Sequence, residues 1–266
     1  MMKKKINHNL LIGGILTGIV VILIVAGFFY TPYDPDAMDA AAKFQGPGIK
    51  HILGCDNFGR DVFSRVLKGS GVTLFVAAMT VLCGSVLGVL VGAFTGYFGG
   101  ILDEALMRIN DAVFAFPSIL LALVFVSLAG SGTRNVIVAL GIAFVPSFAR
   151  IVRGEFLHQR NLDYVQSARL MGASHMRIMF VHILPNVFPV LASSIMIGFN
   201  NAVIAEAGLS YLGIGVQPPD ASLGRMLSES QAYLFSAPLN ALVPGIAMII
   251  MILGFTLLAD GLKKNA

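Results

Sequence analysis

The chain has 266 residues, of which 56% are hydrophobic and only 12% are charged, and its mean hydropathy is +0.83. Soluble domains carry about twice this share of charged residues, so the composition excludes an ordinary soluble protein and indicates an all-α membrane protein. The net charge of +4 is interpreted as a sign of membrane topology, not of nucleic-acid binding.

Several uncharged windows are long enough to cross a bilayer, which needs about 20 apolar residues. They predict six transmembrane helices, within residues 6–33, 69–102, 112–133, 135–149, 178–205 and 230–259. The fourth window is the shortest and has to borrow flanking residues such as Ile151 and Val152. Because six is an even number, both termini are expected on the same side of the membrane.

The first crossing follows a basic leader, residues 1–9, and fills residues 10–30. A cleaved signal peptide is the alternative, but the apolar run is longer than the hydrophobic region of a usual signal peptide. Residues 31–68 resemble a soluble segment between the first two crossings. Within this segment, the apolar and the charged residues of 60–67 fall on opposite sides of a helix. This pattern predicts a short interfacial helix with its charged residues directed toward water.

The second crossing carries glycines four residues apart, at Gly84, Gly88, Gly92 and Gly96. Glycines at this spacing form one smooth helix face, which lets membrane helices approach closely. Glycine is also simply common in membrane helices. The regular spacing favours a packing face, either for another helix of this chain or for a second subunit.

Residues 103–116 form an amphipathic entry to the third crossing, which begins at Pro117. The fifth crossing carries Asn200 and Asn201 and ends at Glu206. These three polar residues are candidates for the wall of a translocation path. A carboxylate at the end of a crossing can equally well be solvated at the membrane surface.

A charged passage between the fourth and fifth crossings, residues 153–185, predicts two short helices. Gly172 suits the end of the first because glycine adopts the left-handed conformation freely, and Ser174 suits the N-cap of the second. Pro185 is expected to end that second helix. One face of it is apolar, with Met176, Met179, Phe180, Ile183 and Leu184. Helices this short are marginal alone, so the apolar face predicts a groove on a partner protein.

Lys and Arg are biased toward one side of the predicted topology. Eleven of the eighteen fall on the side that carries both termini and the charged passage. Positive residues are enriched in cytoplasmic loops, so this side is predicted to be cytoplasmic.

No set of residues suited to catalysis or metal binding stands out, so the chain is not expected to be an enzyme or to bind a metal or cofactor. It contains no G-x-x-x-x-G-K-[ST] motif for ATP. No crossing carries the row of ionisable residues that a stand-alone secondary carrier or channel would be expected to place near the midplane. That alternative remains, as does an intramembrane enzyme, but an external energy source is favoured.

Several segments resemble a known family. Gln166-Ser167-Ala168, followed at the same spacing by Gly172 and Leu184-Pro185, resembles the EAA loop of importer permeases of ABC transporters. Glu and Ala are usual where Gln166 and Ser167 stand. Residues 32–35, 53–65 and 209–219 resemble the peptide/nickel branch, in particular its C-type second permease subunit.

The resemblance implies a permease subunit of a bacterial or archaeal cytoplasmic membrane importer. It would form a heterodimer with a sister permease, be served by an extracytoplasmic solute-binding protein, and couple to two ATPases that bind ATP and Mg. Residues 1–70 would then be an N-terminal helix with an extracytoplasmic segment, and residues 71–266 the five-helix permease core. Dipeptides, oligopeptides, nickel, metal chelates and glutathione-like solutes all remain possible substrates.

The coupling role falls on the loop 163–185. The residues expected to contact the ATPases are Gln166, Ser167, Ala168, Arg169, Gly172, Met176, Met179, Phe180, Leu184 and Pro185.

Overall fold

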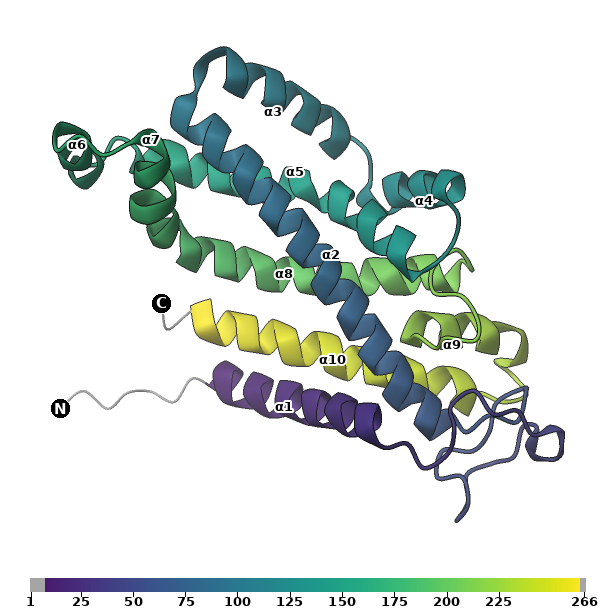
Figure 1. Ribbon diagram of the computed structural model, residues 1–266. Coiled ribbons are helices and arrows are strands. Elements are labelled where there is room, and N and C mark those ends of the chain that lie inside the picture. Colours follow the sequence, from purple (N-terminus) through teal and green to yellow (C-terminus); the bar gives the residue numbers. More distant parts are fainter. Residues whose placement is uncertain (1–7, 264–266) are drawn as a thin grey trace, which may run out of the picture.

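The computed structural model describes residues 8–263, which form a helical bundle (Figure 1). Its long helices are α1 (His8–Phe29), α2 (Val62–Phe98), α5 (Thr133–Gln159), α8 (Leu184–Tyr211) and α10 (Leu239–Lys263). Shorter helices are α3 (Gly100–Phe114), α4 (Ser118–Ala129), α6 (Asp163–Leu170), α7 (His175–Arg177) and α9 (Leu223–Ser230). Single turns complete the set: η1 (Ala40–Ala42), the π-helical η2 (Ile178–Ile183) and η3 (Gln231–Tyr233). The first seven residues of the predicted basic leader lie outside the described part of the chain.

Helices α2 and α5 run parallel to one another. Gly84 faces Phe144 near the start of the contact, and Gly96 faces Phe156 near its end. Parallel neighbours require the chain between them to return across the bundle. Helices α3 and α4 make this return as a pair bent by 87°. The bend falls before Pro117, which lacks an N–H and restricts the residue that precedes it.

The chain therefore passes through the bundle six times, as predicted. The passage that departs most from a single continuous helix is, however, the third and not the fourth. The fourth passage, predicted to be the shortest, is the continuous 27-residue helix α5. The third is divided between α3 and α4, and α4 has only 12 residues. Five helices, together with this bent pair, are long and apolar enough to cross a membrane.

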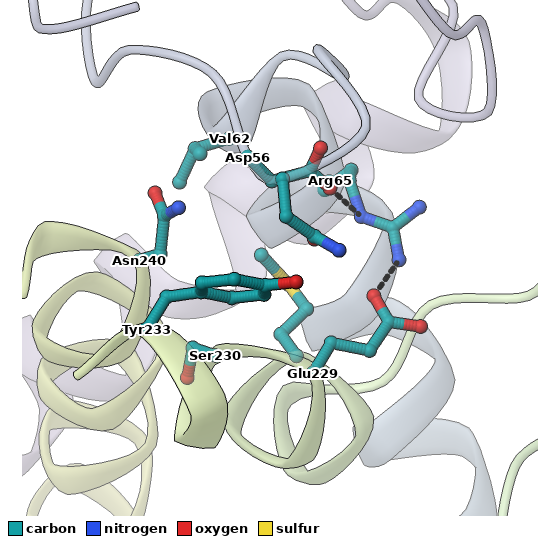
Figure 2. Close-up of a pocket in the computed structure, with 9 residues that line it drawn as sticks. Asp56, Val62, Arg65, Glu229, Ser230, Tyr233 and Asn240 are labelled. Carbon is teal, nitrogen blue, oxygen red and sulfur yellow. Dashed lines mark hydrogen bonds and ion pairs between the residues drawn. The ribbon is translucent and has the colours of Figure 1, made fainter. Parts of the chain in front are cut away.

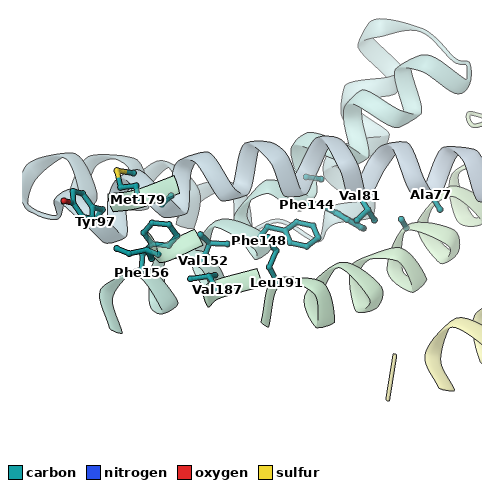
Figure 3. Packing of buried hydrophobic residues seen from close by; sticks show 14 of the residues in the cluster. Ala77, Val81, Tyr97, Phe144, Phe148, Val152, Phe156, Met179, Val187 and Leu191 are labelled. Atoms are coloured by element: carbon teal, nitrogen blue, oxygen red, sulfur yellow. The ribbon is translucent and has the colours of Figure 1, made fainter. Parts of the chain in front are cut away.

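The glycine face of α2 packs within this chain. A Cβ at Gly88 would lie 2.5 Å from the Cβ of Phe148, and one at Gly92 would lie 2.5 Å from the carbonyl oxygen of Ala149. Only glycine permits this approach, so the alternative in which this face meets a second subunit is wrong. The packed core continues along α5 to α8 and the η2 turn (Figure 3).

Helix α1 lies beside α10 at the edge of the bundle (Figure 1). Small residues again allow close contact, because Gly13 meets the backbone of Leu257 and Leu258 while Gly261 meets Leu10. The pair is antiparallel. The two ends of the described chain consequently lie at the same end of the bundle as α6 and α7 (Figure 1).

The predicted interfacial helix over residues 60–67 is wrong. Helix α2 starts at Val62 and continues without a break to Phe98. Asp61 caps it, since the carboxylate accepts the N–H of Ser64 at 2.8 Å. The side chains of Arg60 and Arg65 do not face water, because both are buried against other segments.

Cys55 lies in the connection before α2 and is only 2% exposed. Burial, followed by the nearby carboxylates of Asp61, Asp56 and Asp39, raises the pKa of its thiol from an ordinary 9.0 to about 11. The thiolate fraction at neutral pH is therefore lowered about 100-fold. Between these two pH values the unfolded state loses the thiol proton while the folded state keeps it. The contribution of Cys55 to the free energy of unfolding is therefore complete below pH 9.0 and is lost as the pH rises toward about 11.

We expect Cys55 to react with a maleimide at pH 7.5 at least about 100-fold more slowly in the native protein than in denaturant, because the thiolate is the nucleophile. A Cys83→Ala background isolates the signal, since Cys55 and Cys83 are the two cysteines of the chain. Mass spectrometry of timed samples gives the rates. Equal rates in the two states would contradict the assigned burial.

Candidate functional site

The loop between α5 and α8 begins with the predicted helix α6 and the predicted glycine break. Gly172 has a φ of +80°. Its N–H donates to the carbonyl of Arg169 at 2.9 Å, and the N–H of Ala173 donates to the carbonyl of Ala168 at 3.1 Å. This bonding pattern satisfies the last carbonyls of α6 and fixes the direction of the chain as it leaves the helix.

The second helix of the loop starts as predicted but does not end at Pro185. Ser174 caps it by accepting the N–H of Arg177 at 3.4 Å. In the η2 turn the N–H of Leu184 donates to the carbonyl of Met179, five residues back. This wider turn accommodates Pro185, which has no N–H to give. The loop therefore runs directly into α8 as one helical rod.

The apolar face predicted to meet a partner is divided in the structure. Met179 and Ile183 are fully buried in the chain's own core, and Ala168 is buried beside them. Phe180 and Leu184 are half-buried against the same core. These side chains attach the loop to the bundle, so the predicted contact role of Ala168 and Met179 is wrong.

A different set of side chains is exposed at this end of the bundle. Leu170 is 90% exposed, Met171 81% and Met176 49%. The polar side chains of Gln166, Ser167 and Arg169 are also exposed. Leu170 and Met171 were missed from sequence, although their place directly before Gly172 puts them at the tip of the helix–glycine–helix turn. We call Leu170, Met171 and Met176 the loop tip.

Polar contacts hold the loop against the end of α2. The hydroxyl of Tyr97 lies 2.8 Å from Nδ1 of His175. The guanidinium of Arg169 lies over the Tyr97 ring, 5.4 Å from its centre. Arg160 donates to the carbonyl oxygens of Gly96 and Tyr97 at 3.0 and 3.3 Å. The orientation of the loop is thus fixed by a helix some 80 residues earlier in the chain.

A cavity of about 620 Å³ opens between the α3–α4 connection, α5 and α8. Its lining residues are Phe114, Phe116, Pro117, Ser118, Ile119, Ala143, Phe144, Ser147, Phe148, Ile151, Ser194, Ile197, Gly198, Asn201, Ile204 and Ala205. Asn201 is therefore the one of the three predicted path residues that borders this cavity.

The other two predicted path residues do not line this cavity. The amide of Asn200 donates to the hydroxyl of Thr256 at 2.8 Å, which joins α8 to α10. Glu206 is fully buried and accepts the hydroxyl of Ser210 at 2.6 Å, while Ser210 accepts the N–H of Val216. Asn200 and Glu206 therefore hold neighbouring segments together and do not face the cavity.

At the opposite end of the bundle from α6, buried arginines join the 30–61 segment to α9. Arg60 bonds Asp56 and Glu229, each at 2.6 Å. Arg65 is 1% exposed in its side chain and lies 3.3 Å from the same Glu229 carboxylate (Figure 2). Arg225 completes the group at 3.1 Å from Glu229. We call Asp56, Arg60, Arg65, Arg225 and Glu229 the Glu229 ion cluster.

A small cavity of about 20 Å³, enough for one water, lies beside this cluster. Among residues 8–263, no group of three or more His, Cys, Asp or Glu is arranged to hold a metal ion. The Glu229 ion cluster contains three arginines against two carboxylates, so its net charge does not favour a cation.

Known proteins of similar sequence match nearly the whole chain. The chain is 41% identical over 258 residues to the glutathione transport system permease protein GsiD of Pectobacterium atrosepticum, covering 94% of this chain and 84% of that protein. It is 34% identical to the dipeptide transport system permease protein DppC of Haemophilus influenzae, covering 97% and 90%.

The fold is also found among solved structures. A chain of the MetNI methionine ABC transporter in an inward-facing conformation matches with a TM-score of 0.63 at 20% identity, covering 76% of this chain and 95% of that one. An amino acid ABC transporter matches with a TM-score of 0.58 at 17% identity, covering 76% and 94%. At this identity the likeness concerns the fold alone.

A family model matches residues 88–265, which include α5, the loop and the cavity wall. Together with the relatives above, this match places the chain in a multi-pass family of bacterial transport proteins. The chain belongs to the family described as binding-protein-dependent transport system inner membrane component, and it is a membrane-spanning permease subunit of an ABC importer.

Proposed function

We propose that this chain is one of two permease subunits in an ATP-driven importer of short peptides or of peptide-like solutes such as glutathione. The names of the relatives support this substrate class, because they are permeases for glutathione, dipeptides and peptides. Its partners would be a sister permease, two ATPases that bind ATP and Mg, and an extracytoplasmic solute-binding protein. The chain itself would bind no cofactor.

The end of the bundle that carries α6 and α7 would face the cytoplasm, together with both termini. The common location of the two described chain ends and the loop supports this orientation (Figure 1). The bias of Lys and Arg toward the same side agrees with it. The solute-binding protein would then dock at the other end, where residues 1–70 add the 30–61 segment to the permease core of residues 71–266.

The observation that carries the proposal is the form of the 163–185 loop. Its tip exposes Leu170, Met171 and Met176, whereas Met179 and Ile183 anchor it in the core. Exposed apolar side chains at the end of a rigid helical element suit the groove of a partner protein. Because the loop continues into α8, a displacement of the tip by an ATPase would be transmitted to the helix that carries Asn201. Gln166, Ser167 and Arg169 would border the same contact.

We expect Gly172→Val to abolish most of the ATP hydrolysis that the loaded binding protein stimulates in the reconstituted importer. Valine is strained at the φ of +80° by about 1–2 kcal/mol, which lowers the population of the correct loop conformation by roughly 5–30-fold. Gly172→Asn is the matched control, because asparagine tolerates this conformation. No atom lies within 4 Å of a Cβ at this position, so the two variants differ in backbone strain and not in packing.

The measurement is phosphate release by complexes in proteoliposomes, with and without the loaded binding protein. Co-purification of all subunits shows that both variants assemble. Full stimulation in Gly172→Val, or an equal loss in both variants, would refute the coupling role of the glycine turn.

A further inference from the structure

The cavity wall that this chain contributes carries no titratable group. Its lining is aliphatic and aromatic apart from Ser118, Ser147, Ser194 and Asn201, and it includes no Asp, Glu, Lys, Arg, His, Cys or Met. Arg150 does not line the cavity, but its guanidinium stacks on the Phe114 ring, 4.1 Å from the ring centre. Its charge is offset by an ion pair with Asp111 at 2.9 Å. The wall itself is therefore uncharged.

The polar groups on this wall differ in whether they are free to form a hydrogen bond with a solute. The hydroxyl of Ser194 already donates to the carbonyl of Val190 at 3.0 Å. The side-chain amide of Asn201 and the hydroxyl of Ser147 are exposed and make no hydrogen bond to any residue between 8 and 263. The neighbouring Asn200 donates its amide N–H to Thr256 and its amide oxygen is buried, so Asn201 is the amide that α8 presents to this cavity.

An asparagine amide has two N–H donors and a carbonyl acceptor, which is the complement of a peptide group. A charged group gains no counter-charge on this wall, whichever its sign. A metal cation would find none of the carboxylate, imidazole or thiolate ligands that bind it. A cavity of about 620 Å³ is in the range that encloses a small organic solute.

We propose that Asn201 is a specificity-determining residue that recognises the amide groups of the passing solute, and that the neutral wall makes passage through this subunit independent of the sign of the solute's charge. The proposal rests on the proposed function and names the chemistry that this chain selects: peptide amides, with acidic, neutral or basic side chains, and no free metal cations.

The test uses the complete importer in proteoliposomes and three dipeptides, Ala–Ala, Ala–Glu and Ala–Lys, at saturating binding protein. Uptake by each variant is divided by uptake in the wild type, which cancels the preference of the binding protein. Asn201→Asp is expected to lower the relative uptake of Ala–Glu against Ala–Lys by roughly tenfold, through repulsion at close range. Asn201→Lys is expected to reverse this ratio.

Asn201→Leu is expected to lower uptake of all three dipeptides by the same factor, roughly tenfold, because it removes the amide and adds no charge. Asn186→Asp is the matched control: it makes the same chemical change on α8 at an exposed position outside the cavity. It should leave the three uptake ratios equal.

The failures of the two proposals are distinguishable. Wild-type uptake with equal ratios in Asn201→Asp and Asn201→Lys would overturn the role of Asn201 and leave the proposed function standing. A wild-type importer that takes up none of the three dipeptides would refute the peptide substrate class, and the inference about the wall with it.

Discussion

Replacing Gly92 with alanine is expected to destabilise the protein, although the same change in most helices does the opposite. Alanine in place of a helical glycine normally stabilises by about 0.5–1 kcal/mol. At Gly92 the new Cβ would lie 2.5 Å from the carbonyl oxygen of Ala149 and 2.9 Å from the backbone nitrogen of Arg153. Backbone atoms cannot rotate away, so α2 and α5 must separate. Overpacking of this kind costs about 1–3 kcal/mol, and the packed core along both helices is disturbed with it.

Gly154→Ala is the matched control, because Gly154 lies in α5 and no atom comes within 4 Å of a Cβ there. We expect it to raise the melting temperature while Gly92→Ala lowers it. Circular dichroism in detergent measures both, since the chain contains no tryptophan. A Gly92→Ala protein as stable as the wild type would contradict the close packing of α2 on α5.

The glycine spacing on α2 predicted a packing face but not its partner. Spacing is a local property of one helix, whereas the identity of the opposing helix depends on how the whole chain returns. The parallel arrangement of α2 and α5 follows from the bent α3–α4 pair, whose break at Pro117 was predicted as the start of a crossing. The break and the smooth glycine face were therefore predictable from sequence, whereas the parallel packing of α2 on α5 that results from both was not.

The loop shows the same division between local and tertiary information. Gly172 and Ser174 were predicted correctly, because helix ends depend on the conformations and hydrogen bonds of a few neighbouring residues. The helical period used to group Met176 with Met179 did not allow for the π turn at 178–183, which changes the register and lets Pro185 lie inside a helix. Met179 is consequently buried and Met176 remains exposed.

Asn200 and Asn201 illustrate why two adjacent polar residues in a helix cannot both be assigned to one site from sequence. Adjacent helical residues point about 100° apart, so only one of them could face a given cavity. Nothing in the sequence near them identifies Thr256 as the partner of Asn200. The buried arginines Arg60, just before α2, and Arg65, within it, were misread for a related reason. Glu229 lies 169 residues from Arg60, and no local window contains both.

Replacing Glu229 with methionine is expected to loosen the end of the bundle opposite α6. Its carboxylate accepts from Arg60, Arg65 and Arg225, and the first two side chains are only 4% and 1% exposed. Removing one partner from a buried ion pair costs about 3–5 kcal/mol, because the charge that remains is still buried. The 30–61 segment should then detach more readily from α9, so that trypsin cleaves faster after Lys43 and Lys50, whose side chains are already exposed in the native protein.

Two variants separate the loss of charge balance from other effects. Glu104→Met removes a carboxylate whose pair with Arg108 is exposed, 72% and 80%, and such pairs contribute little. It should leave both the melting temperature and the rate of trypsin cleavage unchanged. Adding Arg225→Met to Glu229→Met removes the arginine whose carboxylate partner in this cluster is Glu229, so the double variant should be more stable than Glu229→Met alone. If the double variant is instead the less stable of the two, the cost of losing Glu229 does not come from unpaired buried charge.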